Sequence, residues 1–407
     1  MHVSYLYASL YAAWPDLPWL YLAYFFAGLT LCGLGYQFLV IAGIVKFCRL
    51  LAAESNGATQ DPATPPISIL KPLRGTDPRM YEAFRSHCLQ DYPEFEIIFG
   101  VADGADPAVA EVERLQREFP LRRIHLMVCP ELLGTNRKVS TLVQLLPLAR
   151  YDLLLINDSD ILVPPDYLRK IAAGFASEGV SAGRTGMVTT LYRATAGATL
   201  ASRLEALTIA TDFAGGVLGA YALEGRLTFG LGATLAVRRE ALEAIGGLSP
   251  LLDCLADDHD LGNRLARAGY DVVLAPLVVE TALPGASFRE MLQHQLRWAR
   301  TIRDRRPRGY IGLGVTHVMP WALLACLCSG FAGWSLGLLV VSGLLRFSVA
   351  AALCTSVLRD RAADLDLWML PLRDAVAALI WIASFAGNTV EWRGERFRLR
   401  AGKLEKL

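Results

Sequence analysis

Two carboxylates one residue apart, Asp158 and Asp160, end the apolar run YDLLLIN at residues 151–157. In an extended chain, side chains at positions i and i+2 point to the same side, so both can face one ligand. Carboxylate oxygens are the ligands that Mg²⁺ and Mn²⁺ prefer, usually together with water and substrate phosphates. The pair therefore predicts either a divalent-cation site or a turn that caps the helix expected from Pro165.

Further acidic residues stand at two other places where an element is expected to begin or end. Asp103 closes the run FEIIFGVAD, either as a plain turn residue or as an acceptor of hydrogen bonds from a nucleotide base. Asp257, Asp258 and Asp260 open the helical stretch LADDHDLGNRLARAGY. Carboxylates at the start of a helix interact favourably with the positive end of the helix dipole. Three of them exceed what a cap needs, and one can serve as a general base towards an acceptor hydroxyl.

Basic residues offer two ways to meet a negatively charged substrate. Lys138 in NRKVS is either an exposed lysine at a helix start or a cation near a nucleotide. The stretch at 290–310 joins Trp298 to Arg297 and to further arginines, among them Arg300, Arg303, Arg305 and Arg306. This helix either lies on anionic lipid or sets Arg297 against a diphosphate leaving group while Trp298 frames the acceptor.

The elements that must position these residues alternate between short β-rich runs and amphipathic helical runs. The expected strands are residues 67–72, 95–103, 124–128 and 151–157, and the expected helices are 107–119, 137–149 and a third from Pro165. This alternation predicts an α/β fold with a mostly parallel sheet covered on both faces. Ligands of such sheets bind at the carboxyl ends of the strands, where the chain places Asp103, Asp158 and Asp160.

Apolar residues gather outside this alternating region. The chain has 407 residues, 53% hydrophobic and 19% charged, with a mean hydropathy of +0.35. Residues 19–45 contain no charge and are long enough to cross a bilayer. Lys46 and Arg49 follow at once, whereas residues 1–18 lack Lys and Arg. The positive-inside rule then places the short N-terminus outside and the domain at 67–310, after a linker at 46–66, in the cytosol.

The C-terminal third predicts further membrane helices. Residues 312–358 carry a single charge, Arg346, and suffice for two spans. Residues 366–387 contain Arg373 and Asp374, which are rare in a span unless paired. We expect this segment to enter the membrane only partly, so that the basic tail at 388–407 stays cytosolic.

The overall charge and the cysteines give no sign of nucleic-acid binding or of a cysteine metal site. The formal net charge of +1 gives no reason to expect nucleic acid as a partner. The eight cysteines lack metal-ligand spacing and are expected to be reduced, structural thiols.

The ordered acids followed by an RW pair give the chain a family resemblance. It resembles the inverting GT-A glycosyltransferases with the signature D, D, D, (Q/R)xxRW. It is more similar still to the ceramide glucosyltransferase family and its bacterial relatives that glycosylate hopanoids, and is closest to the hopanoid branch. The segments that carry this resemblance are ISILKPLRGTDP, LQDYPEFEIIFGVAD, NRKVS, LADDHDLG, HQLRWARTIR and VEWRGERFRLRAG.

The resemblance implies how a nucleotide-sugar donor would be bound. Asp103 would bind the uridine part of a UDP-sugar, and Lys138 would stand near the nucleotide. Asp158 and Asp160 would hold the metal–diphosphate, with Mg²⁺ or Mn²⁺ as the cofactor.

The resemblance also implies how the sugar would be transferred. Asp258, the second of the adjacent acids, would be the general base, and Arg297 and Trp298 would be the RW of the last motif. The chain departs from the signature at His294, which stands where the family has Gln or Arg.

The implied function is a multi-pass enzyme of the cell inner membrane that moves a sugar from a UDP-sugar to a lipid hydroxyl. The nearest branch implies UDP-N-acetylglucosamine and the hopanoid bacteriohopanetetrol, with UDP-glucose and ceramide as the alternative. The apolar stretches at 201–225 and 229–239 are candidates for the acceptor rim or ordinary core. A processive polysaccharide synthase or a non-catalytic UDP-sugar-binding membrane protein would share the signature.

Overall fold

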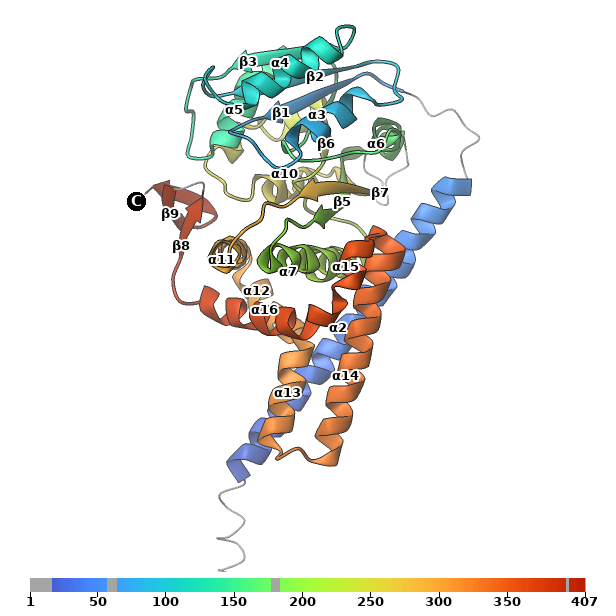
Figure 1. Cartoon of the computed structure of the whole chain (residues 1–407), viewed down its shortest axis with the longest axis vertical. Coiled ribbons are helices and arrows are strands. Elements are labelled where there is room, and N and C mark those ends of the chain that lie inside the picture. The colour runs from blue at the N-terminus through green and yellow to red at the C-terminus, as the bar shows by residue number, and fades with distance from the viewer. Residues whose placement is uncertain (1–16, 57–63, 177–183, 393–394, 407) are drawn as a thin grey trace, which may run out of the picture.

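The computed structural model describes residues 17–56, 64–176, 184–392 and 395–406. Figure 1 shows a rounded α/β part above a slender stem of helices. The N-terminal helix α2 (Leu17–Asn56) runs the length of the stem and up beside the α/β part. The chain therefore consists of a sheet domain tied to an apolar stalk from both of its ends.

A seven-stranded sheet forms the centre of the α/β part. Its strand order is β3-β2-β1-β4-β6-β5-β7. Neighbouring strands run parallel except at β6, which is antiparallel to both β4 and β5. The strands are β1 (Ile67–Pro72), β2 (Phe95–Val101), β3 (Arg123–Val128), β4 (Leu153–Ile156), β5 (Thr185–Thr195), β6 (Leu235–Arg238) and β7 (Asp271–Ala282). The predicted α/β class with a mostly parallel sheet is confirmed.

Both faces of the sheet are covered, which is why its central strands read as continuous apolar runs. In β1, Ile69 belongs to the core on one face and Leu70 to the core on the other. In β4, Leu155 and Ile156 divide in the same way. The covering helices are α3 (Met80–Cys88), α4 (Ala108–Glu118), α5 (Arg137–Leu145), α6 (Tyr167–Ala176), α9 (Arg239–Ala244) and α10 (Asp257–Arg267). The expected strands and helices between 67 and 176 all form, with ends shifted by a few residues.

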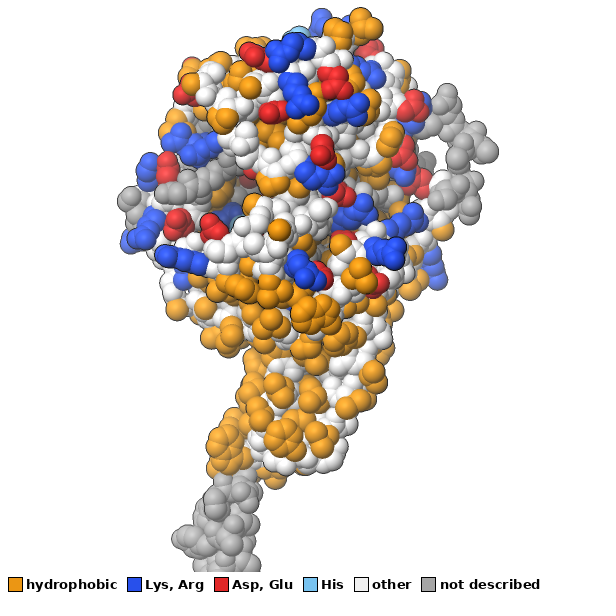
Figure 2. Space-filling view, in the orientation of Figure 1, with side chains coloured by type: hydrophobic (Ala, Val, Ile, Leu, Met, Phe, Trp, Pro, Cys, Tyr) orange, Lys and Arg blue, Asp and Glu red, His pale blue; other side chains and the backbone are white. Residues whose placement is uncertain are grey.

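The stem consists of α2 with α13 (Val318–Cys328) and α14 (Gly333–Ala352), which lie side by side (Figure 1). Aromatic side chains join these helices near the N-terminal end of α2. Tyr24 stacks on Trp334 with ring centroids 5.4 Å apart, and Phe26 stacks on Trp321 at 5.8 Å. The surface of the stem and the underside of the sheet domain are largely hydrophobic (Figure 2). Such a surface suits a bilayer with aromatic rings near its boundary.

Four helical segments among the described residues are long and apolar enough to cross a membrane: 18–54, 200–224, 333–357 and 367–384. A fifth candidate is the pair of helices 307–316 and 318–328, bent by 62°. The segment 200–224 comprises α7 (Leu200–Thr208), a π-helical turn η2 (Ile209–Phe213) and α8 (Ala214–Glu224), and 61% of its apolar window is buried within the protein. Figure 1 shows α7 and α16 (Leu370–Ser384) lying across the top of the stem rather than along it.

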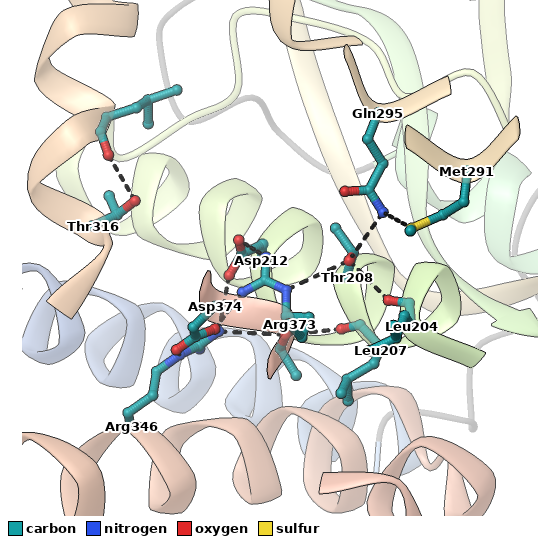
Figure 3. A network of polar contacts seen from close by, with 12 residues as sticks. Leu204, Leu207, Thr208, Asp212, Met291, Gln295, Thr316, Arg346, Arg373 and Asp374 are labelled. Atoms are coloured by element: carbon teal, nitrogen blue, oxygen red, sulfur yellow. Dashed lines mark hydrogen bonds and ion pairs between the residues drawn. The ribbon is translucent and has the colours of Figure 1, made fainter. Parts of the chain in front are cut away.

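The charges of the apolar C-terminal helices are paired inside the protein. Arg346 of α14 donates to Asp374 of α16 at 3.0 and 3.1 Å and to Asp212 of η2 at 2.9 Å. Arg373 donates to Asp374 at 2.7 Å and also pairs with Asp212 (Figure 3). The quartet of two arginines and two aspartates has no net charge, which makes its burial tolerable.

Two parts of the predicted domain organisation differ from the structure. Helix α2 continues to Asn56, so residues 46–56, expected in a linker, are helical. The expected basic tail forms an antiparallel sheet of β8 (Thr389–Trp392), β9 (Glu395–Arg400) and β10 (Lys403–Lys406). Val390, Phe397, Leu399 and Leu404 bury one face of this small sheet against Leu255. The tail's alternation of apolar and charged residues is the pattern of a half-buried strand rather than of an unstructured basic segment.

Candidate active site

The acidic loop after β4 is held from below by buried polar side chains. Asn157, which is fully buried, donates from Nδ2 to the carbonyl of Ala233 at 2.7 Å and to the Tyr167 hydroxyl at 2.9 Å. Lys71 at the end of β1 donates from Nζ to the carbonyl of Asp158 at 3.0 Å. Burial lowers the pKa of Lys71 to about 7, although the charges of Asp160 and Asp158 oppose this. The loop is thereby fixed at the carboxyl edge of the sheet.

Lys138 joins this loop to the start of α10. Its Nζ lies 2.8 Å from Asp158 Oδ1 and 3.4 Å from Asp257 Oδ2. Asn136 fixes the position of the lysine, because its side chain caps α5 through the Val139 amide and donates to the carbonyl of Cys254. Burial alone would lower the pKa of Lys138, but the carboxylates of Asp158 and Asp257 together raise it. Lys138 is therefore an enclosed cation between two acids, not an exposed lysine at a helix start.

Asp258 faces Asp158 across Gly232. A Cβ atom on this glycine would stand 3.1 Å from Asp258 Oδ2 and 3.6 Å from Asp158 Oδ2. The helix α10 begins after Ala256, which has no side-chain cap, while Asp257 is engaged by Lys138. Burial, together with the neighbouring charge of Asp257, raises the pKa of Asp258 to about 6. A carboxylate with such a pKa is suited to accept a proton near neutral pH.

Asp160 completes the carboxylates at this edge. It accepts a hydrogen bond from the Thr281 hydroxyl at the end of β7. Burial and the charge of Asp158 raise its pKa to about 6. The negative charges of Asp158 and Asp160 repel each other. A Mg²⁺ or Mn²⁺ ion bound by both carboxylates would offset this repulsion. Among the described residues, no cluster of three His, Cys, Asp or Glu side chains forms a closed metal cage, so the remaining ligands would come from substrate and water.

Asp103 stands at the carboxyl end of β2, two strands away from β4 in the sheet. Its exposed carboxylate accepts from the amide of Ala105 at 2.9 Å, which closes a short turn. The structure therefore places Asp103 on the same edge as Asp158 without bringing it into the group around Lys138.

The RW pair lies on α11 (Phe288–Arg305), on the side of the site that leads to the stem. An aromatic series connects Trp298 to the sheet. The Trp298 ring is 6.3 Å from Phe213 of η2, and Phe213 is 4.8 Å from Tyr192 of β5. Burial raises the pKa of Tyr192, and the nearby carboxylates of the site raise it further. Arg297 precedes Trp298 with a half-buried side chain.

Three of the other α11 arginines bind the protein itself. Arg300 and Arg303 donate to the carbonyls of Ala386 and Gly387 at 3.1 and 2.7 Å, just beyond the C-terminus of α16. Arg305 pairs with Asp260 of α10. These guanidinium groups satisfy the end of a helix and join it to the catalytic region. The interpretation of this helix as a lipid-binding basic face therefore does not hold for these three residues.

Sequence reasoning missed several residues that build the site, namely Lys71, Asn136, Tyr192, Gly232 and Thr281. Lys71 was detectable as a charge inside the otherwise apolar strand ISILKP. Asn136 was detectable as an N-cap residue directly before a helical run. Tyr192 and Thr281 belong to strands far along the chain, and only the order of strands in the sheet brings them to this edge.

Comparison with known proteins places the chain among glycosyltransferases. The family model described as "Glycosyl transferase family 21" matches residues 29–405. Ceramide glucosyltransferase 3 of Caenorhabditis elegans is 23% identical over 350 residues, which cover 84% of this chain and 74% of that protein. Ceramide glucosyltransferase 1 of the same organism is 23% identical over 383 residues, covering 89% and 78%. A solved structure, the mannosyltransferase PcManGT from Pyrobaculum calidifontis in complex with GDP-Man and Mn²⁺, is 20% identical with a TM-score of 0.49, covering 90% of this chain and 98% of that one.

Proposed function

The chain belongs to glycosyl transferase family 21, and from this premise we propose that it transfers a sugar from a UDP-sugar to a hydroxyl of a membrane lipid. The observation that carries the proposal is the approach of Asp158 and Asp258 to one glycine, Gly232, beside the enclosed cation Lys138. A site with one base and one cationic clamp suffices for an inverting transfer. In that reaction the acceptor oxygen attacks C1 of the sugar from the face opposite the leaving UDP.

Asp258 is the general base in this proposal. It would take the proton of the acceptor hydroxyl as the oxygen–C1 bond forms and the bond from C1 to the diphosphate breaks. Its raised pKa supports this role. A base with a pKa near the working pH is largely ionised and still binds a proton strongly. The engagement of Asp257 by Lys138 and Asn136 favours Asp258 over its neighbour.

The donor would lie along the carboxyl edge of the sheet. Asp103 would hold the uridine part, and Lys138 would attract the diphosphate. Asp158 and Asp160 would hold a divalent cation, which when bound would offset the negative charge of the diphosphate. Arg297 would add a further positive charge beside the leaving group, and Trp298 would frame the acceptor.

The lipid nature of the acceptor is supported by the position of the site above the apolar stem (Figures 1 and 2). We propose that α2 and two spans within residues 312–358, built on α13 with the residues before it and on α14, cross the inner membrane with the N-terminus outside and the sheet domain in the cytosol. Helix α16 would lie in the interface: its exposed face is apolar, with Trp368 just before it and Leu372, Leu379 and Ile382 along it. The contact of β10 with the loop before α10, where the Leu404 amide donates to the Asp253 carbonyl, fits a C-terminus on the cytosolic side.

Ceramide with UDP-glucose is the acceptor and donor pair that we propose first, because the relatives reported above are ceramide glucosyltransferases. A hopanoid with UDP-N-acetylglucosamine, which the sequence of the segment HQLRWARTIR favours, is the second pair.

Two experiments test the proposal. Mass spectrometry of lipids from cells with and without the gene should reveal one glycolipid that is lost, either a glycosylceramide or a glycosylated hopanoid. Purified full-length protein should form the same product from the matching UDP-sugar, and the Asp258→Asn variant should not. Wild-type rates in that variant would refute the base assignment, and an unchanged lipid profile together with inactive purified protein would refute the function.

A further inference from the structure

His294 and Glu205 form a side-chain pair between α11 and α7. The imidazole Nδ1 of His294 forms a hydrogen bond with Oε1 of Glu205. Glu205 is only 6% exposed, whereas about a third of the His294 side chain is accessible, at 34%. A buried carboxylate that holds one ring nitrogen fixes the orientation of the imidazole and leaves Nε2 as its remaining polar atom.

The pair adjoins the proposed acceptor side of the site. The His294 ring lies 4.9 Å from the ring of Trp298, one turn further along α11. Tyr192 links the pair to the carboxylates, because the charges of Asp258 and of Glu205 both act on its phenol. The rings of His294, Trp298, Phe213 and Tyr192 therefore form one connected series from the pair to the sheet.

On its other side the pair adjoins the polar network at the level of the membrane helices. Gln295, the residue after His294, donates to the Thr208 hydroxyl at 3.5 Å, and Arg373 of the buried quartet reaches the same hydroxyl at 3.5 Å. Figure 3 shows Gln295, Thr208 and Arg373 in this series. The dyad thus lies between the proposed base and the helices along which a lipid would arrive.

We propose that His294, oriented by Glu205, hydrogen-bonds a second polar group of the lipid acceptor while the acceptor's reacting hydroxyl faces Asp258. This inference rests on the proposed function and narrows its substrate class. The acceptor is a lipid whose polar head carries another hydroxyl or an amide close to the hydroxyl that is glycosylated. Glu205 is a positioning residue in this arrangement, as the carboxylate is in other carboxylate–imidazole pairs.

The side chain at this position differs from the one in the family signature. The position of His294 is Gln or Arg in the wider signature, and both of those side chains donate hydrogen bonds over a longer reach. A histidine is shorter and needs a partner to hold it, which Glu205 supplies. The His294→Gln variant should therefore retain much of the function, whereas His294→Ala should not.

The test measures kcat/KM of purified full-length protein with UDP-glucose and two acceptors in mixed micelles. Ceramide carries an amide and a second hydroxyl beside its primary hydroxyl, and hexadecanol carries the primary hydroxyl alone. We expect His294→Ala to lower kcat/KM for ceramide about tenfold, the size of one lost hydrogen bond to ligand. The value for hexadecanol should change less than about twofold, because no second polar group is there to lose.

The remaining variants separate ligand binding from structure. We define discrimination as the ratio of kcat/KM for ceramide to kcat/KM for hexadecanol. Glu205→Gln should lower this ratio less than His294→Ala does, and His294→Gln should keep it near the wild-type value. The KM for UDP-glucose should be unchanged in all three variants. His125→Gln on the exposed face of β3 is the matched control and should behave as wild type. Equal losses for both acceptors, or a lower unfolding temperature with unchanged discrimination, would overturn the inference alone. Wild-type protein that glycosylates neither acceptor would overturn the ceramide form of the proposed function as well.

Discussion

Lys138 Nζ lies 2.8 Å from Asp158 Oδ1 and so joins the acidic loop after β4 to the start of α10. Lysine is strongly hydrated, and the ion pairs with Asp158 and Asp257 offset the water that this largely buried side chain loses. The same ammonium is positioned to meet a diphosphate when a donor arrives. Lys138 therefore has a structural partner in the free protein and an electrostatic role in the proposed complex.

Replacing this lysine should weaken donor binding. We expect Lys138→Met to raise the KM for the UDP-sugar by about tenfold to a hundredfold, because a charge-assisted hydrogen bond to phosphate is worth about 1.5–3 kcal/mol. The KM for the lipid should stay near its wild-type value. Lys170→Met removes a lysine of the same length from a surface pair with Asp166 and is the control. An unchanged donor KM in Lys138→Met would contradict the role.

The raised pKa of Asp258 predicts the acid limb of the pH profile. The base must be ionised, so kcat/KM should fall as the pH drops through about 6. The charge of Asp257 is one cause of the raised pKa, and its removal favours the ionised form of Asp258. In Asp257→Asn the limb should therefore move to lower pH. A limb that stays in place in this variant, measured by initial rates between pH 4 and 8, would argue for a different base.

Metal removal should abolish transfer. Asp158 and Asp160 supply only two carboxylates, so tight binding needs the diphosphate as a further ligand. We expect exhaustive chelation to stop the reaction and added Mg²⁺ or Mn²⁺ to restore it. Calorimetry should show tighter UDP binding with Mn²⁺ in wild-type protein and no gain in Asp160→Asn. Full activity after chelation would refute the metal prediction.

The sequence predicts the first half of the sheet domain well, because its strands and helices are short, regular and consecutive. The hydrophobic run before Asp158 and the helical period after Asn136 are local signals, and both elements form where expected. The three strands β5, β6 and β7 were not predicted, since β6 inserts antiparallel between two strands that run the other way. The pairing joins distant segments and cannot be read from the local pattern, although β5 and β7 are themselves rich in β-branched residues.

The residues of the site also differ in whether a local sequence signal predicts them. The order of the motifs singled out Asp158, Asp258 and Lys138. The structure brings both aspartates to Gly232 and pairs Lys138 with Asp158. The pairing of His294 with Glu205 could not be read from sequence, because it depends on the packing of α11 against α7. The partners of Arg300, Arg303 and Arg305 could not be predicted for a related reason, because a basic helix face has the same sequence pattern whether it meets lipid or the carbonyl end of another helix.

The quartet of Arg346, Arg373, Asp212 and Asp374 predicts that single substitutions lower the stability of the protein more than a paired substitution does. Arg346→Met leaves the buried carboxylate of Asp374 with less positive charge, at a cost of about 3–5 kcal/mol. Asp374→Leu leaves Asp212 as the one carboxylate paired with Arg346 among the described residues and should cost a similar amount. The double variant removes one charge of each sign and keeps the pair of Arg373 with Asp212, so it should be more stable than either single variant. Thermal unfolding of detergent-purified protein measures all three, with the exposed Val340→Ala on the same helix as control. Additive losses in the double variant would show that the four charges do not act as a unit.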